Sequence, residues 1–97
     1  MSHTIDIPVG YEKITGLAAA KGLTPPNAIA NVAVIVVEGQ AVRIRDDGTD
    51  PTAAEGLPLA VDVPFQYRGD ISALKFIETA ASATIFVLYY KRAKNRL

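Results

Sequence analysis

Alternation of apolar and polar residues, the pattern typical of β-strands, recurs along most of the chain. It is clearest at residues 40–46, QAVRIRD, where two apolar side chains point to one face and two arginines to the other. Residues 28–39, AIANVAVIVVEG, are apolar on both faces along a β-branched run, as in a central strand covered on both sides. The Glu38-Gly39 pair between these two segments predicts a tight hairpin.

Further short strands are predicted wherever β-branched and aromatic residues lie between turn signals. These segments are residues 11–17, 59–63, 64–68, 71–78 and 84–91. The segment 18–28, AAAKGLTPPNA, is interpreted as strand–turn–strand, because Pro25-Pro26 and the flanking glycines oppose a helix. The pattern therefore predicts an all-β fold, a small antiparallel β-sandwich or barrel of about seven or eight short strands.

The chain of 97 residues is expected to form one domain, since neither a linker nor an internal repeat divides it. Residues 1–10 are predicted to be an extended N-terminal arm, because Pro8 and Gly10 interrupt any helix. Residues 11–91 are predicted to be the β domain, and residues 92–97 a basic C-terminal tail.

Charge is distributed unevenly, although the formal net charge is zero and gives no electrostatic reason to expect a nucleic-acid partner. Residues 1–90 hold all ten acidic residues and six of the ten basic ones. The other basic residues are Lys91, Arg92, Lys94 and Arg96. The tail is either a solvated terminus or a basic arm that docks on an acidic partner surface.

The chain contains no cysteine, and its only histidine is His3. These absences exclude disulfides, thiolate zinc sites, cysteine nucleophiles and Ser-His-Asp triads. No apolar run reaches the roughly 18 residues of a membrane-spanning helix, and the N-terminus lacks the pattern of a secretory signal. We therefore expect no cofactor, no membrane partner and synthesis in a reducing cytosol.

Polar chemistry is concentrated in the segment 45–52, RDDGTDPT. Its residues are Arg45, Asp46, Asp47, Gly48, Thr49, Asp50, Pro51 and Thr52. A metal site needs several converging oxygen ligands, yet Asp46 and Asp47 are adjacent and point opposite ways on an extended chain. Asp47, Asp50 and Glu55 form a candidate cation set only if the loop curls around an ion.

A catalytic carboxylate pair drawn from Asp46, Asp47 and Asp50, as in a small hydrolase, is a second hypothesis for this loop. It needs a cleft and a partner base, and no histidine, cysteine or lysine lies nearby. We favour a structural loop, in which Asp47-Gly48 forms a turn and the Asp and Thr side chains satisfy loop amides. Arg45 is expected to pair with an acid across the loop.

Two other features are compatible with ligand binding. RGD at residues 68–70 matches the integrin-binding tripeptide, but a strand end followed by a turn explains these three residues equally well. Aromatic residues could form a stacking platform, although in strands they are more often core or interface residues. They are Phe65, Tyr67, Phe76, Phe86, Tyr89 and Tyr90. The adjacent Tyr89 and Tyr90 are expected on opposite faces, with one exposed for a partner contact.

Four segments carry a resemblance to a known family: PNAI (26–29), VEGQAVRIRDDGTDPTAAEGLPL (37–59), GDISALKFIE (69–78) and VLYY (87–90). Together they resemble small virion proteins of tailed bacteriophages. In those proteins a strand ending in arginine runs into an R-D-D-G-T-x-P-T-x-x-x-G-x-x-L loop, and a final strand ends in two aromatics. The resemblance covers roughly residues 11–91, while the basic tail lies outside it.

The resemblance implies a non-enzymatic structural part of the phage particle. The expected role is a capsid decoration (cement) protein that binds the major capsid protein on the capsid surface, commonly as a trimer, after synthesis in the host cytoplasm. We expect the loop at residues 46–58 to be ordered and to lie near a subunit or capsid interface. A tail- or fibre-associated virion protein, or a β module that binds a receptor or sugar, is the alternative.

Overall fold

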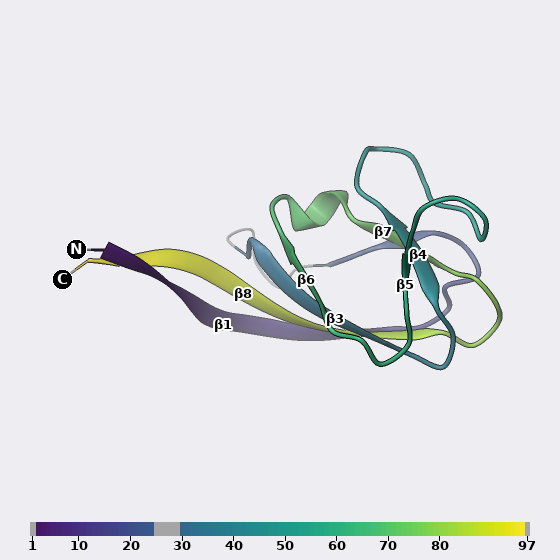
Figure 1. The fold of residues 1–97 in the computed structure, drawn as a ribbon, viewed down its shortest axis with the longest axis horizontal. Helices are drawn as coiled ribbons and strands as arrows, with labels where there is room; N and C mark the ends of the chain where they lie inside the picture. The colour runs from purple at the N-terminus through teal and green to yellow at the C-terminus, as the bar shows by residue number, and fades with distance from the viewer. Residues whose placement is uncertain (1, 25–29, 97) are drawn as a thin grey trace.

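A computed structural model shows two antiparallel sheets of four strands each (Figure 1). The structure describes residues 2–24 and 30–96. The strands are β1 (Ser2–Ile14), β2 (Lys21–Gly22), β3 (Val32–Glu38), β4 (Val42–Arg45), β5 (Leu57–Leu59), β6 (Phe65–Arg68), β7 (Lys75–Glu78) and β8 (Thr84–Arg96), with one 3-10 helix, η1 (Ile71–Ala73), before β7. The predicted all-β class is confirmed, and the two layers are those of a small β-sandwich.

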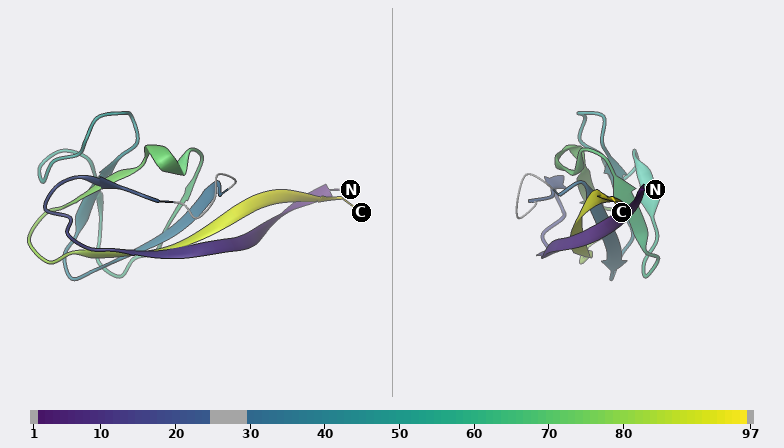
Figure 2. Two further views of the ribbon diagram at one scale, coloured as in Figure 1. Left: turned by 180° about the vertical axis from the view of Figure 1, so that it is seen from behind. Right: turned by 90° about the vertical axis from the view of Figure 1, so that its left-hand side faces the viewer.

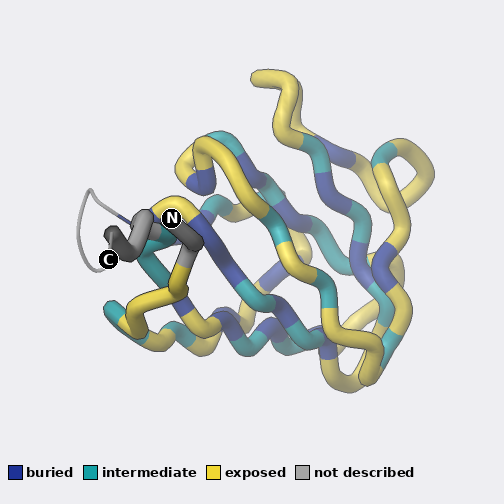
Figure 3. The backbone as a smooth tube through the Cα atoms, turned by 60° about the vertical axis from the view of Figure 1, so that its left-hand side comes forward, coloured by how far each residue is buried: buried dark blue, intermediate teal, exposed yellow. Residues whose placement is uncertain are grey.

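The core lies between the two sheets. In the first sheet, ordered β1-β8-β3-β6, the inward residues Ile35, Val37 and Tyr89 have no exposed surface. Phe76 joins the same cluster from the second sheet, ordered β2-β7-β4-β5. Figure 3 shows buried positions alternating with less buried ones along the strands. Burying each side chain of this size stabilises the fold by roughly 1.5–3 kcal/mol.

The predicted hairpin at Glu38-Gly39 is wrong. β3 pairs with β6 and β8, whereas β4 pairs with β5 and β7, so the chain crosses between the sheets here. Gly39 has a φ of +89°, and a Cβ on it would lie 2.4 Å from the Ser82 carbonyl oxygen. Because Val37 and Val42 are both fully buried, placing their strands in facing sheets lets both side chains enter one core.

The predicted strand at residues 59–63 is also wrong. β5 ends at Leu59, the first residue of that segment. Val61 makes only an isolated parallel bridge to Val37, and Asp62 has a φ of 63°, a left-handed conformation that does not continue a strand. This segment instead carries the chain from the second sheet back to the first.

The predicted strand at residues 71–78 begins with η1 rather than with extended chain. The Asp70 carboxylate accepts a hydrogen bond from the Ser72 amide and so caps the helical turn. β7 follows at Lys75–Glu78. The predicted shared face of Leu74 and Phe76 is confirmed, since both side chains are buried.

The first strand ends earlier than predicted. β1 stops at Ile14 rather than at residue 17, because Gly16 turns the chain with a φ of +70°. Within the segment interpreted as strand–turn–strand, residues 18–20 form no strand, and the short β2 is the strand found among the described residues. The remainder of that interpretation, with Pro25-Pro26 and the PNAI segment, falls on residues 25–29 and lies outside the described residues.

The two longest strands, β1 and β8, pair along their length, with a bulge between Pro8 and Gly10. β3 accompanies β8 only as far as Tyr90. Beyond it, residues 2–7 and 91–96 have only each other as strand partners within the described part of the chain. They project from the sandwich as a two-stranded extension, here called the terminal ribbon (Figure 1). Figure 2 shows both chain ends at its tip. Most of the predicted arm and tail therefore pair with each other.

Candidate interaction surfaces

The first half of the polar loop is held by its own side chains. Arg45 donates to both carboxylate oxygens of Asp47, with an Nε–Oδ1 distance of 3.0 Å, which confirms the predicted pairing of Arg45 with an acid. This hydrogen bond is the main reason that the pKa of Asp47 falls to about 2. Asp47 also accepts from the Thr49 amide, and Gly48 has a φ of +87°, so the predicted Asp47-Gly48 turn is confirmed.

The second half of the loop closes on Thr52. Its hydroxyl accepts from the amides of Ala54 and Glu55, at 3.3 and 3.0 Å, as predicted for threonines in this loop. Its backbone also exchanges hydrogen bonds with that of Glu55 in both directions. Pro51 is buried beneath this turn. The predicted order of the loop thus has a specific structural basis.

Arg43 anchors the loop to the second sheet and was missed by the sequence reasoning. Its guanidinium donates to the carbonyl oxygens of Ala53 and Gly56, at 3.0 and 2.9 Å. The only signal in the sequence was an arginine two residues before Arg45, on the same face of β4. That position is equally typical of a solvated strand face, so the contact could not be predicted.

The carboxylates of the loop diverge. Asp46 accepts from the Tyr67 hydroxyl at 2.8 Å and so ties the loop to β6, whereas Asp47 binds Arg45. The hydrogen bond to Asp46 raises the pKa of the Tyr67 phenol. Among the residues that the structure describes, no three Asp, Glu, His or Cys side chains form a group able to hold a metal ion. The structure therefore does not bring the candidate set Asp47, Asp50 and Glu55 together in such a group.

Among the side chains that the structure describes in the terminal ribbon are an ion pair and two exposed isoleucines. Arg92 donates to both carboxylate oxygens of Asp6, at 2.8 and 3.0 Å, and thereby lowers the pKa of that carboxyl. The Arg92 amide also donates to the Asn31 side chain at 2.8 Å. Ile5 and Ile7 are 42% and 41% exposed. Arg92 is thus bound within the chain, whereas the isoleucines face solvent.

The strand register places the isoleucines on a different face from the ion pair. Ile7 lies opposite Lys91 in the pairing, two residues beyond the inward-facing Tyr89, and Ile5 lies opposite Ala93. Because strand residues alternate between faces, this side of the terminal ribbon continues the core-facing side of its sheet. The half-buried Lys91 borders the isoleucines, while the side chains of Lys94 and Arg96 lie outside the described part of the chain.

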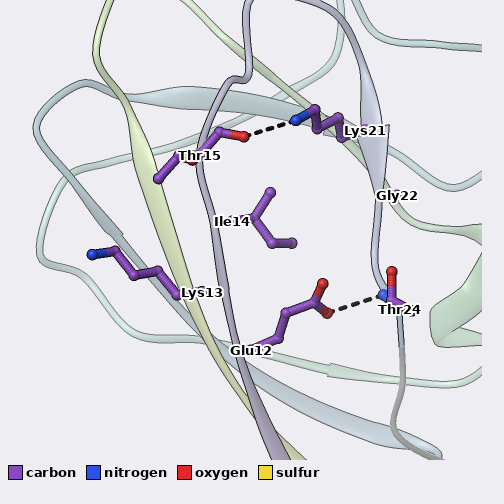
Figure 4. A pocket seen from close by; sticks show the side chains of 7 residues that line it. All are labelled: Glu12, Lys13, Ile14, Thr15, Lys21, Gly22 and Thr24. Carbon is purple, nitrogen blue, oxygen red and sulfur yellow. Dashed lines mark hydrogen bonds between the residues drawn. The ribbon is translucent and has the colours of Figure 1, made fainter.

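A cleft of about 430 Å³ lies between β1 and β2, where the edges of the two sheets meet without pairing (Figure 4). Figure 4 shows Glu12 accepting a hydrogen bond from the Thr24 amide at 3.0 Å and Lys21 donating to the Thr15 carbonyl at 3.0 Å. Glu12 also accepts from the hydroxyl of the buried Tyr89. Burial and this hydrogen bond raise the pKa of the Tyr89 phenol. These contacts hold the two sheets together along the side of the sandwich where β1 and β2 do not pair.

Glu12 was another residue that the sequence reasoning missed. Glu12 pairs with the buried Val87 and so lies on the inward face of β1. The signal in the sequence was a carboxylate at an inward position of a strand. The prediction that Tyr89 and Tyr90 lie on opposite faces with one exposed is wrong in part, since Tyr89 is buried and Tyr90 is half-buried. The exposed aromatic is instead Tyr11, 60% exposed beside the cross-strand Leu88.

The RGD tripeptide is engaged in local structure. Gly69 adopts a φ of +135°, and Asp70 receives hydrogen bonds from both the amide and the hydroxyl of Ser72. Of the six aromatic residues considered for a stacking platform, Phe76 and Tyr89 are fully buried in the core, the more usual role of aromatic residues in strands.

Comparison with known proteins gives no relationship: neither a protein-family model, nor a curated protein, nor a solved structure matches the chain. Over the described residues, the structure contains no helix with the length and apolar character needed to cross a membrane.

Proposed function

We propose that the chain is a non-enzymatic structural protein of a tailed-bacteriophage virion. In this proposal it is a decoration (cement) protein that is made in the host cytoplasm, binds the major capsid protein on the outer capsid lattice and stabilises the head. The observation that carries the proposal is the terminal ribbon with its exposed isoleucines. Exposed apolar side chains on a projecting element are typical of contacts between proteins.

A two-stranded ribbon is at best marginally stable by itself in water. In the terminal ribbon, neither β3 nor the second sheet covers the strands, and Ile5 and Ile7 face solvent. Packing these side chains against another protein removes apolar surface from water and also orders the ribbon. A projecting, apolar and basic ribbon is therefore best explained as an element that becomes fully stable within an assembly.

The polar loop supports a role in presenting a fixed surface to another protein rather than a role in catalysis. Asp46 and Asp47 are occupied by Tyr67 and Arg45, and the loop is anchored by Arg43. A rigid loop of this kind offers a fixed polar shape to a neighbouring protein at little entropic cost. The same segment carries most of the resemblance to phage virion proteins.

Capsids assembled without this chain provide the direct test. Purified wild-type protein should co-sediment with them and raise the temperature at which they rupture. Replacing both Ile5 and Ile7 with serine should weaken capsid binding by about tenfold or more, because an apolar anchor is lost. Val63→Ser is a matched control, because Val63 is also exposed but lies outside the ribbon. Wild-type protein that fails to bind such capsids would refute the proposal.

A receptor- or sugar-binding β module, on a tail or fibre, is the second candidate. The exposed patch of Tyr11 and Leu88 on the outer face of the first sheet favours it, because exposed aromatic rings bind sugars and apolar partners. A glycan array probed with the purified chain discriminates the two. Specific binding that Tyr11→Ala abolishes would support this candidate, and an array without signal would remove its sugar-binding form.

A further inference from the structure

The polar loop contains the one Asp-Gly pair of the sequence, Asp47-Gly48, and the sequence has no Asn-Gly pair. At an Asp-Gly pair the glycine amide nitrogen can attack the aspartate side chain, because glycine has no side chain to obstruct the approach. The product is a five-membered succinimide ring. The reaction is spontaneous and needs no enzyme, so the chain modifies itself wherever such a pair is accessible and unrestrained.

The structure leaves the Asp47-Gly48 pair accessible. Residues 46–50 are all exposed, and the Asp47 side chain is 53% exposed. Apart from the chain neighbours of Gly48, no described atom lies within 4 Å of the position that a Cβ would take, and its φ of +87° suits glycine. Among the described residues, no packing against the pair therefore prevents ring closure.

The restraint on Asp47 comes instead from the hydrogen bonds of its carboxylate. Arg45 donates to both oxygens, with an Nε–Oδ1 distance of 3.0 Å, and the Thr49 amide donates to Oδ1 at 3.3 Å. A bidentate, charge-assisted contact of this kind fixes the carboxylate and favours its ionised form. Ring closure has to break the contact, because one carboxyl oxygen leaves and the succinimide carries no charge.

We propose that Asp47-Gly48 is a site of spontaneous isoaspartate formation and that Arg45 controls its rate. The Gly48 nitrogen bonds to the Asp47 Cγ, while one carboxyl oxygen departs as water with the amide proton and the carboxyl proton. A water molecule then opens the ring at either carbonyl. Breaking the bond from nitrogen to Cγ regenerates aspartate, and breaking the bond from nitrogen to the main-chain carbonyl carbon gives isoaspartate. The product has the same atomic composition as the starting chain.

Isoaspartate at this position would change the shape of the loop. The main chain would run through the side-chain carbons of Asp47, one atom longer than before, and the free carboxylate would be attached directly to Cα. That carboxylate would no longer fit both Arg45 and the Thr49 amide. Arg45 thus protects the covalent structure of the loop as well as its conformation. This role does not depend on the proposed function.

Ageing of the folded, full-length chain tests the proposal. Wild-type protein and Arg45→Gln are incubated in mildly acidic buffer below their melting temperatures. Isoaspartate is then quantified by an isoaspartate-specific methyltransferase and located by fragmentation mass spectrometry of a digest. Arg45→Gln should accumulate isoaspartate at residue 47 about tenfold faster, because the carboxylate has lost a bidentate ion pair. Adding Gly48→Ala to this variant should suppress the reaction, since a methyl group obstructs the attack.

Matched controls separate the ion pair from the general order of the loop. Arg43 lies on the same face of β4 and donates to loop carbonyls but not to Asp47, so Arg43→Gln should age like the wild type. Arg45→Lys keeps the charge without the bidentate contact and should age at an intermediate rate. The exposed Asp62-Val63 pair is an internal reference that should stay unmodified in every digest.

Three outcomes overturn the inference, provided that each variant melts cooperatively. Equal rates in the wild type and in Arg45→Gln would refute the role of Arg45. A lack of isoaspartate at residue 47 in the aged Arg45→Gln protein would refute the site itself. Equally fast ageing of Arg43→Gln would assign the effect to loosening of the loop instead of to the ion pair.

Discussion

Single side chains set the behaviour of the polar loop, residues 45–56, at low pH. Asp47 has a pKa of about 2, below the ordinary 3.8, because Arg45 donates to both of its oxygens. A carboxyl with a depressed folded-state pKa contributes its full stabilisation above the ordinary value and loses it as pH falls through the lower one. The turn should therefore remain intact at about pH 4 and loosen towards about pH 2.

Replacing Arg45 with Gln should raise the pKa of Asp47 towards its ordinary value of 3.8, because both the hydrogen bonds and the charge of the guanidinium are lost. The pKa can be followed through the carboxyl carbon in an NMR titration. Arg43→Gln is the control, because Arg43 contacts loop carbonyls and not Asp47. An unchanged Asp47 titration in the Arg45 variant would contradict the assigned cause.

Substitutions of Glu12 and of Tyr89 should lower the free energy of unfolding by different amounts. Tyr89→Phe removes one donor but leaves Glu12 bonded to the Thr24 amide, so we expect a loss of about 1 kcal/mol in the free energy of unfolding. Glu12→Ala leaves the buried Tyr89 hydroxyl and the Thr24 amide without their acceptor, and should cost about 2 kcal/mol or more. Urea unfolding measures both, and Glu12→Gln, which keeps an acceptor, should fall in between. Equal losses of stability for Glu12→Ala and Tyr89→Phe would argue against Glu12 as the shared acceptor of both hydrogen bonds.

At the scale of elements, the crossing between the sheets depends on Gly39. Gly48 has a similar φ, +87° against +89°, but has open space where a Cβ would lie. Gly48→Ala should therefore cost only the roughly 1–2 kcal/mol of a left-handed backbone. Gly39→Ala should cost roughly 1–3 kcal/mol more, because its Cβ would meet the Ser82 carbonyl. Thermal unfolding of both variants compares them, and similar melting temperatures would contradict the packed corner.

The alternation of residues predicted which side of each strand is buried, but not which strands pair. At β4, Val42 and Ile44 do face the core, since burial follows the local period of two. The Glu38-Gly39 hairpin failed because strand pairing is decided by contacts far apart in sequence, and a short glycine connection fits a hairpin or a corner equally well. The local pattern therefore predicts which residues of a strand face the core, but it does not predict which strands pair.

The same distinction applies to the candidate surfaces. The Arg45–Asp47 pair and the Asp47-Gly48 turn could be predicted because they involve neighbouring residues. The bond between Glu12 and Tyr89 spans 77 positions, and nothing in the sequence near either residue indicates the other. The terminal ribbon was likewise hidden, because its strands come from opposite ends of the chain.

At the scale of the whole molecule, the proposed binding of the terminal ribbon to a capsid links the stability of the chain to assembly. A protein that is bound only when it is folded gains stability by mass action. The melting temperature of the wild-type chain should therefore be higher in the presence of capsids than in free solution. Calorimetry of both samples measures the difference, and Ile5→Ser with Ile7→Ser should reduce it. Equal melting temperatures with and without capsids would speak against the ribbon as the anchor.

The order β1-β8-β3-β6 also determines when the chain can finish folding during synthesis. β1 is made long before β8, yet among the described strands it pairs only with β8, which also lies between β1 and β3. While the ribosome is still translating β8, the edge of β3 stays open, and apolar residues such as Ile35 have no cover from that side. Folding of this sheet therefore ends with the insertion of β8, and chains that terminate before it should be recognised by chaperones or aggregate.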